Sequence, residues 1–404
     1  MINTVINGDC LEKLKEIESN YIDAIVTDPP YGLSFMGKKW DYDVPCVDIW
    51  KECLRVLKPG GYLLSFAGTR TQHRMAVNIE DAGFEIRDMI AWVYGSGFPK
   101  SLNIGKAVDK LQGNEREDLG LHPKPGKAGK THTRDGGAFK DDIHITKGTS
   151  EWEGWGTALK PALEPITVAR KPLSEKTVAE NCLKWGVGGI NIDECRVGET
   201  GARTNSNGKR SMYGGNSLIQ SKTHNDSTTQ HDYGRFPANL ILDGSDEVVG
   251  LFPNSKSPAT YTRGTDVLDS NINWNPKKSG TEQIGFNDFG SASRFFYCAK
   301  ASRNERNRGC EDMPLKSSFD NPSGNMGGNM GSRSGLRQNN HPTVKPIALM
   351  EYLVKLVSKE GSTILDPFAG SGTTGVACKN LKRNYILIEK EQEYIDIINK
   401  RLNQ

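Results

Sequence analysis

The sequence predicts an α/β protein built on a mostly parallel sheet with helices on both faces. Two observations predict this class: strand-like and helix-like segments alternate up to about residue 94, and the alternation returns from residue 341 to the C-terminus. Parallel strands need long crossover connections, which are usually helices. A third observation is the balance of 25% charged and 36% hydrophobic residues in 404, which fits a globular soluble chain and excludes wholesale disorder.

The alternation of strands and helices begins in the first 94 residues. Apolar runs predict strands over residues 2–6, 23–26, 62–66 and 84–94. Helical spacing predicts helices over residues 11–17, 47–57 and 71–82. The sequence LKPGG (57–61) indicates a helix stop, since proline and glycine continue a helix poorly.

The last stretch repeats the pattern. It predicts a helix over 347–358, a strand over 363–366, a helix over 373–381, a strand over 385–389 and a final helix to the C-terminus. Between the two stretches, PITVAR (165–170) predicts one more strand of the main sheet and TVAENCLKWG (177–186) a helix. GNMGGNMGS (324–332) is a candidate flexible loop.

Basic charge is concentrated in two polar segments. Residues 121–140 carry five cations against one acid, and residues 196–222 carry five against one, although the net charge of the chain is only +3. Solvated loops and contacts with a polyanion explain these segments equally well.

Cysteine and histidine patterns argue against a metal centre. The eight cysteines form no C-x-x-C pair and the seven histidines no ligand-spaced pair, so neither a metal site nor a disulfide framework is expected. Reduced thiols indicate a cytoplasmic protein. There is no apolar run of roughly 20 residues to span a membrane, and no signal-peptide pattern.

The stretch AIVTDPPYG (24–32) starts as a strand and then meets two prolines. Each proline removes a backbone N–H and fixes φ, so a stiff turn separates the carboxylate of Asp28 from the ring of Tyr31. Either the turn simply ends a strand over a buried tyrosine, or it holds the two side chains for chemistry.

A second informative stretch is TILDPFAGSGTT (363–374). The strand ends in Asp366, a loop with Gly370 and Gly372 opens a helix, and Glu389 ends the following strand. The loop lacks the glycine patterns of dinucleotide and phosphate-binding loops, and Asp366 would repel a phosphate. An acid at the position of Glu389 suits ribose hydroxyls, and Asp366 suits a cation. S-adenosylmethionine supplies both a ribose and an α-amino group; an ordinary strand-to-helix turn is the alternative.

Three motifs together resemble a known family. DPPY (28–31), HPTVKP (341–346) and DPFAGSGTT (366–374), in this order, resemble the β class of amino-group DNA methyltransferases, which methylate N6 of adenine or N4 of cytosine. The resemblance covers about residues 1–104, 150–172 and 290–404. It implies a Rossmann-like S-adenosylmethionine-dependent methyltransferase sheet, circularly permuted, in which residues 2–6 supply the strand beside that of Glu389, with an inserted target-recognition region.

The resemblance also implies site residues. The catalytic set is Asp28, Pro29, Pro30 and Tyr31: the Asp28 carboxylate and the Pro29 carbonyl would accept the amine N–H groups, and Tyr31 would stack on a flipped base. The set expected to contact the cofactor is Asp9, Cys10, Thr343, Lys345, Asp366, Pro367, Phe368, Ala369, Gly370, Ser371, Gly372, Thr373 and Glu389.

Two of these motifs have structural alternatives. Asp9 with Glu12 also reads as a helix capping box, and Pro342 and Pro346 could simply start a helix.

The expected organisation follows. Residues 1–104 form the first part of the catalytic domain, 105–150 a polar basic insertion, 151–172 a catalytic-domain strand, 173–290 a target-recognition domain and 291–404 the second part of the catalytic domain. The expected activity is methylation of adenine N6 in double-stranded DNA, since DPPY favours adenine. N4-cytosine methylation and a non-catalytic DNA-binding subunit remain alternatives, and a homodimer or a separate restriction endonuclease are open partners.

Overall fold

The computed structural model describes residues 2–33, 41–95, 97, 101–121, 144–198, 234–256, 260–262, 282–284, 288–299, 305–317 and 336–403. Most of both basic segments and the whole of GNMGGNMGS lie outside these residues. In the part of the chain that the structure describes, no helix is long and apolar enough to cross a membrane.

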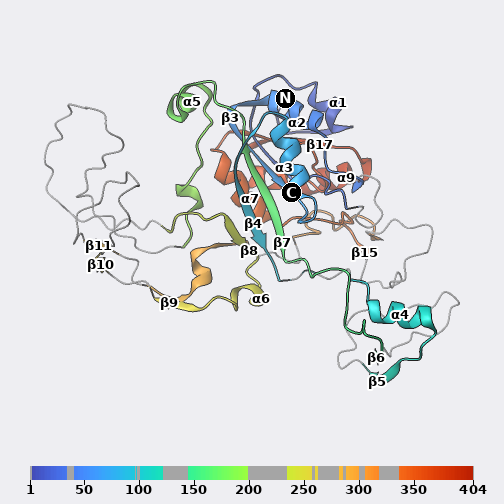
Figure 1. Ribbon diagram of the computed structural model, residues 1–404. Coiled ribbons are helices and arrows are strands. Elements are labelled where there is room, and N and C mark those ends of the chain that lie inside the picture. The colour runs from blue at the N-terminus through green and yellow to red at the C-terminus, as the bar shows by residue number, and fades with distance from the viewer. Residues whose placement is uncertain are drawn as a thin grey trace.

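A nine-stranded sheet forms the centre of the described molecule (Figure 1). Its strand order is β1 (Thr4–Asn7), β17 (Asn384–Glu389), β16 (Thr363–Asp366), β2 (Ile22–Thr27), β3 (Leu57–Phe66), β7 (Leu163–Arg170), β4 (Glu85–Val93), β8 (Leu240–Leu242) and β13 (Tyr297–Cys298). All neighbours run parallel except β7, which is antiparallel to both β3 and β4. The predicted α/β class is therefore confirmed.

The permuted strand order is also present. β1, at the start of the chain, pairs in parallel with β17, near its end, and Asn7 lies opposite Glu389. This pairing places the first and last strands of the chain side by side at one edge of the sheet, as the sequence predicted.

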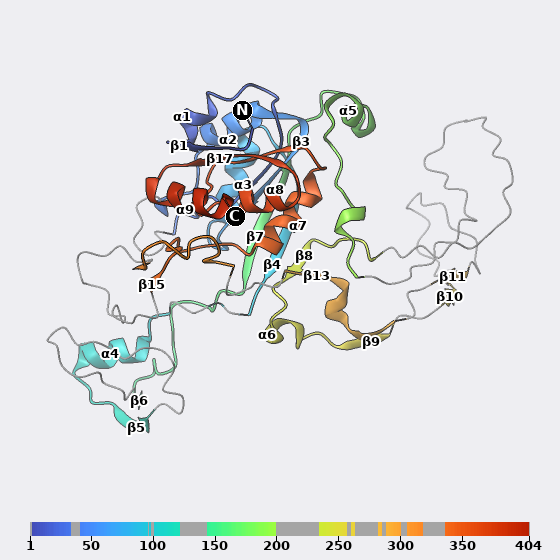
Figure 2. The same ribbon diagram turned by 180° about the vertical axis from the view of Figure 1, so that it is seen from behind.

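Helices cover both faces of the sheet, as the two views show (Figures 1 and 2). One layer contains α1 (Cys10–Leu14), α2 (Val47–Val56) and α3 (Gln72–Asp81), and the other α7 (Ile347–Val357), α8 (Thr373–Asn380) and α9 (Gln392–Leu402). Alternate residues of β17 point to opposite layers: Ile386 and Ile388 are buried with α1–α3, whereas Leu387 packs with α9.

The LKPGG segment ends a helix as expected, but the strand that was expected over residues 62–66 starts earlier. α2 does end at Val56, but β3 begins directly at Leu57 and includes the proline and both glycines. The backbone groups of Pro59 and Gly60 form hydrogen bonds other than those between paired strands. The Gly60 N–H donates to the Lys171 carbonyl, and the Asn181 side chain of α5 (Val178–Trp185) donates to the Pro59 carbonyl. Tertiary contacts thus extend a strand that propensity alone would end.

The connection between β4 and β7 carries a small lobe, seen apart from the sheet in both views (Figures 1 and 2). It contains α4 (Ile104–Gln112), β5 (Glu117–Leu121) and β6 (His144–Lys147). Arg116 holds the lobe together, since it pairs with buried Asp109 and lies 2.8 Å from Glu153.

The other described elements are short and stand outside the nine-stranded sheet. They comprise η3 (Asp193–Cys195), α6 (Asp246–Val249), η4 (Ala292–Phe295) and the antiparallel pair of β9 (Asn254–Lys256) with β12 (Phe289–Ser291). Two further antiparallel pairs join β10 (Thr260–Thr262) to β11 (Glu282–Ile284) and β14 (Lys316–Ser317) to β15 (Leu336–Arg337). Because β8 belongs to the main sheet, the range 173–290 expected for a separate domain includes one strand of the catalytic sheet.

Candidate active site

Acidic side chains lie together at the carboxyl ends of the parallel strands, and this end of the sheet is called the site edge below. Asp9 follows β1, Glu389 ends β17, Asp366 ends β16 and Asp28 follows β2, all at the carboxyl ends of parallel strands. β7 runs the other way, so Glu164, near its beginning, lies at the same edge. In parallel α/β sheets ligands bind at this edge.

The DPPY turn ends in a cluster of four polar side chains. The two oxygens of Asp28 are separately engaged: Oδ1 lies 2.7 Å from the Tyr31 hydroxyl, and Oδ2 lies 2.6 Å from Lys345 Nζ. Glu164 Oε2 lies 2.9 Å from the same hydroxyl and 3.2 Å from the same ammonium nitrogen. The cluster therefore joins DPPY to HPTVKP and to β7.

Burial and charge set the protonation states in this cluster. Burial raises the pKa of Asp28, although the neighbouring Lys345 ammonium opposes the shift. Burial by itself would lower the pKa of Lys345, but the carboxylates of Asp28 and Glu164 outweigh it and the pKa is raised. Burial and the same two carboxylates raise the pKa of Tyr31, so that its hydroxyl stays neutral and the lysine stays charged at neutral pH.

A buried acid holds the backbone of the DPPY turn. The Asp41 carboxylate, only 2% exposed, accepts the N–H groups of Tyr31 at 2.6 Å, Gly32 at 2.9 Å and Leu33 at 3.3 Å. The Thr71 hydroxyl donates to the Tyr31 carbonyl at 2.7 Å. The turn is therefore fixed by side-chain contacts as well as by Pro29 and Pro30.

Asp366 is turned into the protein. It is 3% exposed, and Oδ1 accepts the Thr27 hydroxyl at 2.7 Å and the Phe368 N–H at 3.1 Å, while Oδ2 accepts the Thr374 hydroxyl at 2.5 Å. Burial raises its pKa to about 6, against the lowering effect of these hydrogen bonds. The carboxylate thus ties the glycine loop to β2, and its contact with a cofactor remains a prediction.

The loop from Pro367 to Gly372 has the tight backbone that its glycines predict. Gly370 and Gly372 have φ of 53° and 75°, in the left-handed region that favours glycine. A Cβ at Gly370 would lie 2.8 Å from His341 Nε2, so HPTVKP packs directly on this loop. Ala369 is buried, and the Phe368 ring packs edge-on against Trp50 at 6.3 Å.

Ser371 and Thr373 face inward rather than toward the site edge. The guanidinium of Arg401 donates to the Ser371 carbonyl at 2.7 Å and to both hydroxyls at 3.0 Å, and all three side chains are buried. The structure therefore gives these two predicted contact residues a partner in α9.

Glu389 receives two backbone N–H groups. Gly370 donates to Oε2 at 2.8 Å and Glu391 to Oε1 at 2.9 Å, which links the glycine loop to the end of β17. Burial raises the pKa of Glu389 to about 7 in spite of these bonds. This carboxylate lies on the site edge beside the loop, where ribose hydroxyls were expected.

The residues at the start of α1 are brought near the same corner. Asp9 caps α1 by accepting the Leu11 N–H at 3.1 Å and lies 3.5 Å from Lys390 Nζ, which gives the cap but not the reciprocal contact from Glu12 that a capping box requires. Glu12 pairs with Lys15 at 2.9 Å. Burial raises the pKa of Cys10 to about 12, so its thiol stays neutral.

HPTVKP precedes a helix, as its structural alternative predicted, whereas the cofactor contacts expected of Thr343 and Lys345 remain predictions. Pro346 directly precedes α7, and the Thr343 N–H donates to His341 Nδ1 at 3.4 Å, so the segment starts a helix. It also carries Lys345 to Asp28. Thr343 lies in the turn between these contacts.

Two functional candidates were absent from the sequence prediction. Asp41 lies in a segment without a recognisable motif, and Glu164 is a lone acid at the start of an apolar strand. An acid entering a buried strand is the only signal that could have marked Glu164. The described residues contain no group of three or more His, Cys, Asp or Glu side chains that could hold a metal ion.

A permuted, mostly parallel sheet with a DPPY turn and a glycine loop at the carboxyl ends of neighbouring strands is the arrangement that the resemblance to S-adenosylmethionine-dependent methyltransferases implied. The chain belongs to the N6/N4 DNA methylase family, whose model, described as a DNA methylase, matches residues 22–400. This family takes its methyl group from S-adenosylmethionine. The Glu389 carboxylate beside the glycine loop lies where a ribose could bind, whereas the Asp366 carboxylate is engaged by internal hydrogen bonds.

Individual relatives match the chain over different lengths. The Type II methyltransferase M2.DpnII of Streptococcus pneumoniae is 55% identical over 62 residues, which span 15% of this chain and only 23% of that protein. The Type II methyltransferase M.HindIII of Haemophilus influenzae is 22% identical over an alignment that covers 100% of this chain and 96% of its own. The solved structure of an M1.HpyAVI–SAM complex has a TM-score of 0.40 at 17% identity, covering 99% of both chains.

Proposed function

We propose that this protein methylates the exocyclic N6 amine of adenine in double-stranded DNA, using S-adenosylmethionine and acting on a nucleotide flipped out of the helix. The observation that carries the proposal is the position of Asp28: a carboxylate held by a rigid turn at the site edge, one strand away from the glycine loop after β16. A base inside a duplex cannot reach such a buried group, hence the flipped nucleotide.

The proposed chemistry addresses a weak nucleophile. The lone pair of the adenine amine is delocalised into the ring. An Asp28 carboxylate and the Pro29 carbonyl that accept its two N–H bonds would draw the nitrogen toward tetrahedral geometry. Among the described residues none donates a hydrogen bond to the Pro29 carbonyl, which leaves it available. Bound S-adenosylmethionine supplies the methyl group on a sulfonium sulfur.

The supporting residues would orient the two substrates. Asp41 and Thr71 hold the turn, Tyr31 offers a ring on which a base can stack, and Glu389 offers a carboxylate to ribose hydroxyls. Such preorganisation can supply on the order of several kcal/mol of the barrier reduction.

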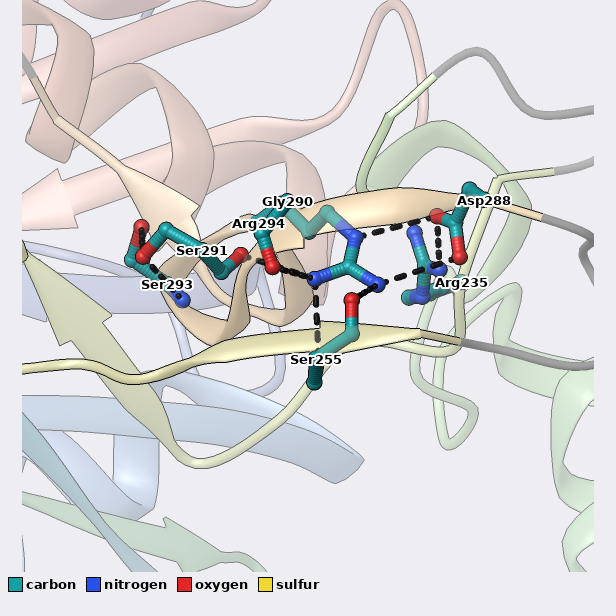
Figure 3. A network of polar contacts seen from close by, with 7 residues as sticks. All are labelled: Arg235, Ser255, Asp288, Gly290, Ser291, Ser293 and Arg294. Carbon is teal, nitrogen blue, oxygen red and sulfur yellow. Dashed lines mark hydrogen bonds and ion pairs between the residues drawn. The ribbon is translucent and has the colours of Figure 1, made fainter.

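We assign target recognition to residues 173–290, and a network of polar contacts joins the end of this range to the segment that follows it. Arg294 there contacts Asp288 and Ser255 and the carbonyls of Gly290 and Ser291, and Arg235 pairs with Asp288 (Figure 3). These hydrogen bonds, led by those from Arg294, lower the pKa of Asp288 to about 2. Through Arg294 the network joins Ser255 to Asp288.

N4-cytosine methylation is the second candidate, because the family includes both activities. Expression in a bacterial host without endogenous methylation, followed by mass spectrometry of its nucleosides, separates them. N6-methyladenine is expected, N4-methylcytosine alone would replace the adenine assignment, and no modified base would favour a non-catalytic DNA-binding role. Long-read sequencing of the same DNA would identify the recognition sequence.

A further inference from the structure

Glu164 belongs to no motif, yet its carboxylate contacts both partners of Asp28. It reaches the Tyr31 hydroxyl at 2.9 Å and Lys345 Nζ at 3.2 Å through the same oxygen, Oε2. Its side chain is 20% exposed, and a hydrogen bond with Glu164 contributes to the raised pKa of Tyr94. The antiparallel direction of β7 places this residue across the site from the glycine loop, with β3 between β2 and β7.

The structure shows Asp28 already occupied. Lys345 binds one of its oxygens and the Tyr31 hydroxyl binds the other. An ammonium at 2.6 Å weakens a carboxylate as an acceptor for a neutral amine, because it neutralises the charge that would polarise the N–H bonds. A target amine therefore competes with these two donors for Asp28.

Releasing the donors is costly unless another acceptor takes them. A buried ammonium or hydroxyl that loses its partner costs several kcal/mol. Tyr31 has one hydroxyl proton, which can go to either carboxylate, and the Lys345 ammonium already lies within salt-bridge distance of both. Small side-chain shifts would thus transfer both donors from Asp28 to Glu164 without leaving either unpaired.

We propose that Glu164 is a positioning residue that takes over the Lys345 ammonium and the Tyr31 hydroxyl when the target amine enters, and so frees Asp28 to accept the amine. This inference rests on the proposed role of Asp28. Glu164 itself touches neither the amine nor the methyl donor; it acts through Lys345 and Tyr31.

The test is a double-mutant comparison of single-turnover methylation, on a duplex that contains the recognition sequence. Glu164→Gln keeps the size of the side chain but removes the charge that holds Lys345, so the rate should fall on the order of 10²-fold, as for small misplacements of reacting groups. In Glu164→Gln combined with Lys345→Gln, no ammonium remains to occupy Asp28. The double variant should therefore methylate faster than Glu164→Gln alone.

If Glu164 has only a structural role, the double variant should methylate more slowly than Glu164→Gln, since removing a second member of a buried cluster destabilises the site further. A rate for Glu164→Gln within twofold of wild type, or a double variant no faster than Glu164→Gln, would overturn the inference. The matched control is Glu85→Gln on the neighbouring strand β4, which also breaks an ion pair, with Arg170 at 2.6 Å, and should leave the rate within about twofold.

Two further measurements keep the result interpretable. Should Glu164→Gln fail to fold, Glu164→Asp is compared in the same way, because it keeps the charge but shortens the reach, and about a tenfold slower rate is expected. Asp28→Ala is measured in parallel: near-normal turnover in that variant would refute the proposed role of Asp28, whereas an inactive Asp28→Ala beside a normal Glu164→Gln would refute only the role of Glu164.

Discussion

Asp41→Ala tests whether the DPPY turn is held by side-chain contacts or by its prolines alone. In the structure one buried carboxylate accepts three successive backbone N–H groups, those of Tyr31, Gly32 and Leu33. Alanine removes the acceptor of all three N–H groups, which belong to residues that are only partly exposed.

The magnitude follows from these contacts. A hydrogen bond to a charged group contributes about 1.5–3 kcal/mol, and a buried donor left unpaired costs a similar amount. Two contacts are short and the third is long at 3.3 Å, so a loss of about 3–5 kcal/mol in the free energy of unfolding is expected. Because Tyr31 and the neighbouring Asp28 would shift with the turn, the methylation rate should fall on the order of 10²-fold.

Urea denaturation measures the stability loss, and single-turnover methylation under conditions where the variant is folded measures the rate. Asp43→Asn is the matched control, because Asp43 is a nearby but half-exposed acid that accepts one backbone N–H, from Val44, and otherwise forms an exposed ion pair with Arg74 at 3.3 Å. It should change the free energy of unfolding by no more than about 0.5 kcal/mol. An Asp41→Ala variant that methylates within twofold of wild type would refute the assignment of Asp41 as the residue that holds the turn.

The remaining predictions concern the site edge. Asp28→Ala should abolish methyl transfer while calorimetry shows an S-adenosylmethionine dissociation constant within about twofold of wild type; a large loss of cofactor affinity would place Asp28 in the cofactor site instead. Burial raises the pKa of Glu389 from 4.5 to about 7, so the folded protein keeps a proton that the unfolded chain has released. The free energy of unfolding should therefore fall as the pH rises from about 4.5 to 7, and fall less steeply in Glu389→Gln; equal slopes in urea titrations would contradict this. Gly370→Ala puts a methyl group 2.8 Å from His341 at a φ of 53°, and should weaken cofactor binding about tenfold or more, whereas unchanged binding in calorimetry would show that the loop can relax.

Much of the fold could be predicted because its signals are local. Strand and helix periods, the glycine loop and the two prolines each act within a few residues, and the predicted elements of the first and last stretches are present with small shifts at their ends. The pairing of β1 with β17 was also predicted. The order of the motifs implied a permuted sheet, in which a strand from the N-terminus lies beside the strand that ends at Glu389.

The composition of the site depended on contacts that no local pattern records. Lys345 reaches Asp28 across 317 residues, and Tyr31 reaches Glu164 across 133, because the antiparallel β7 enters the sheet beside β3. The sequence by itself predicted the α/β sheet and its permutation, and it proposed Asp28 as the central acid. Only the tertiary structure decided that Asp366 is bound internally and that Glu164 shares the donors of Asp28, since burial and hydrogen-bond partners arise when distant segments pack together.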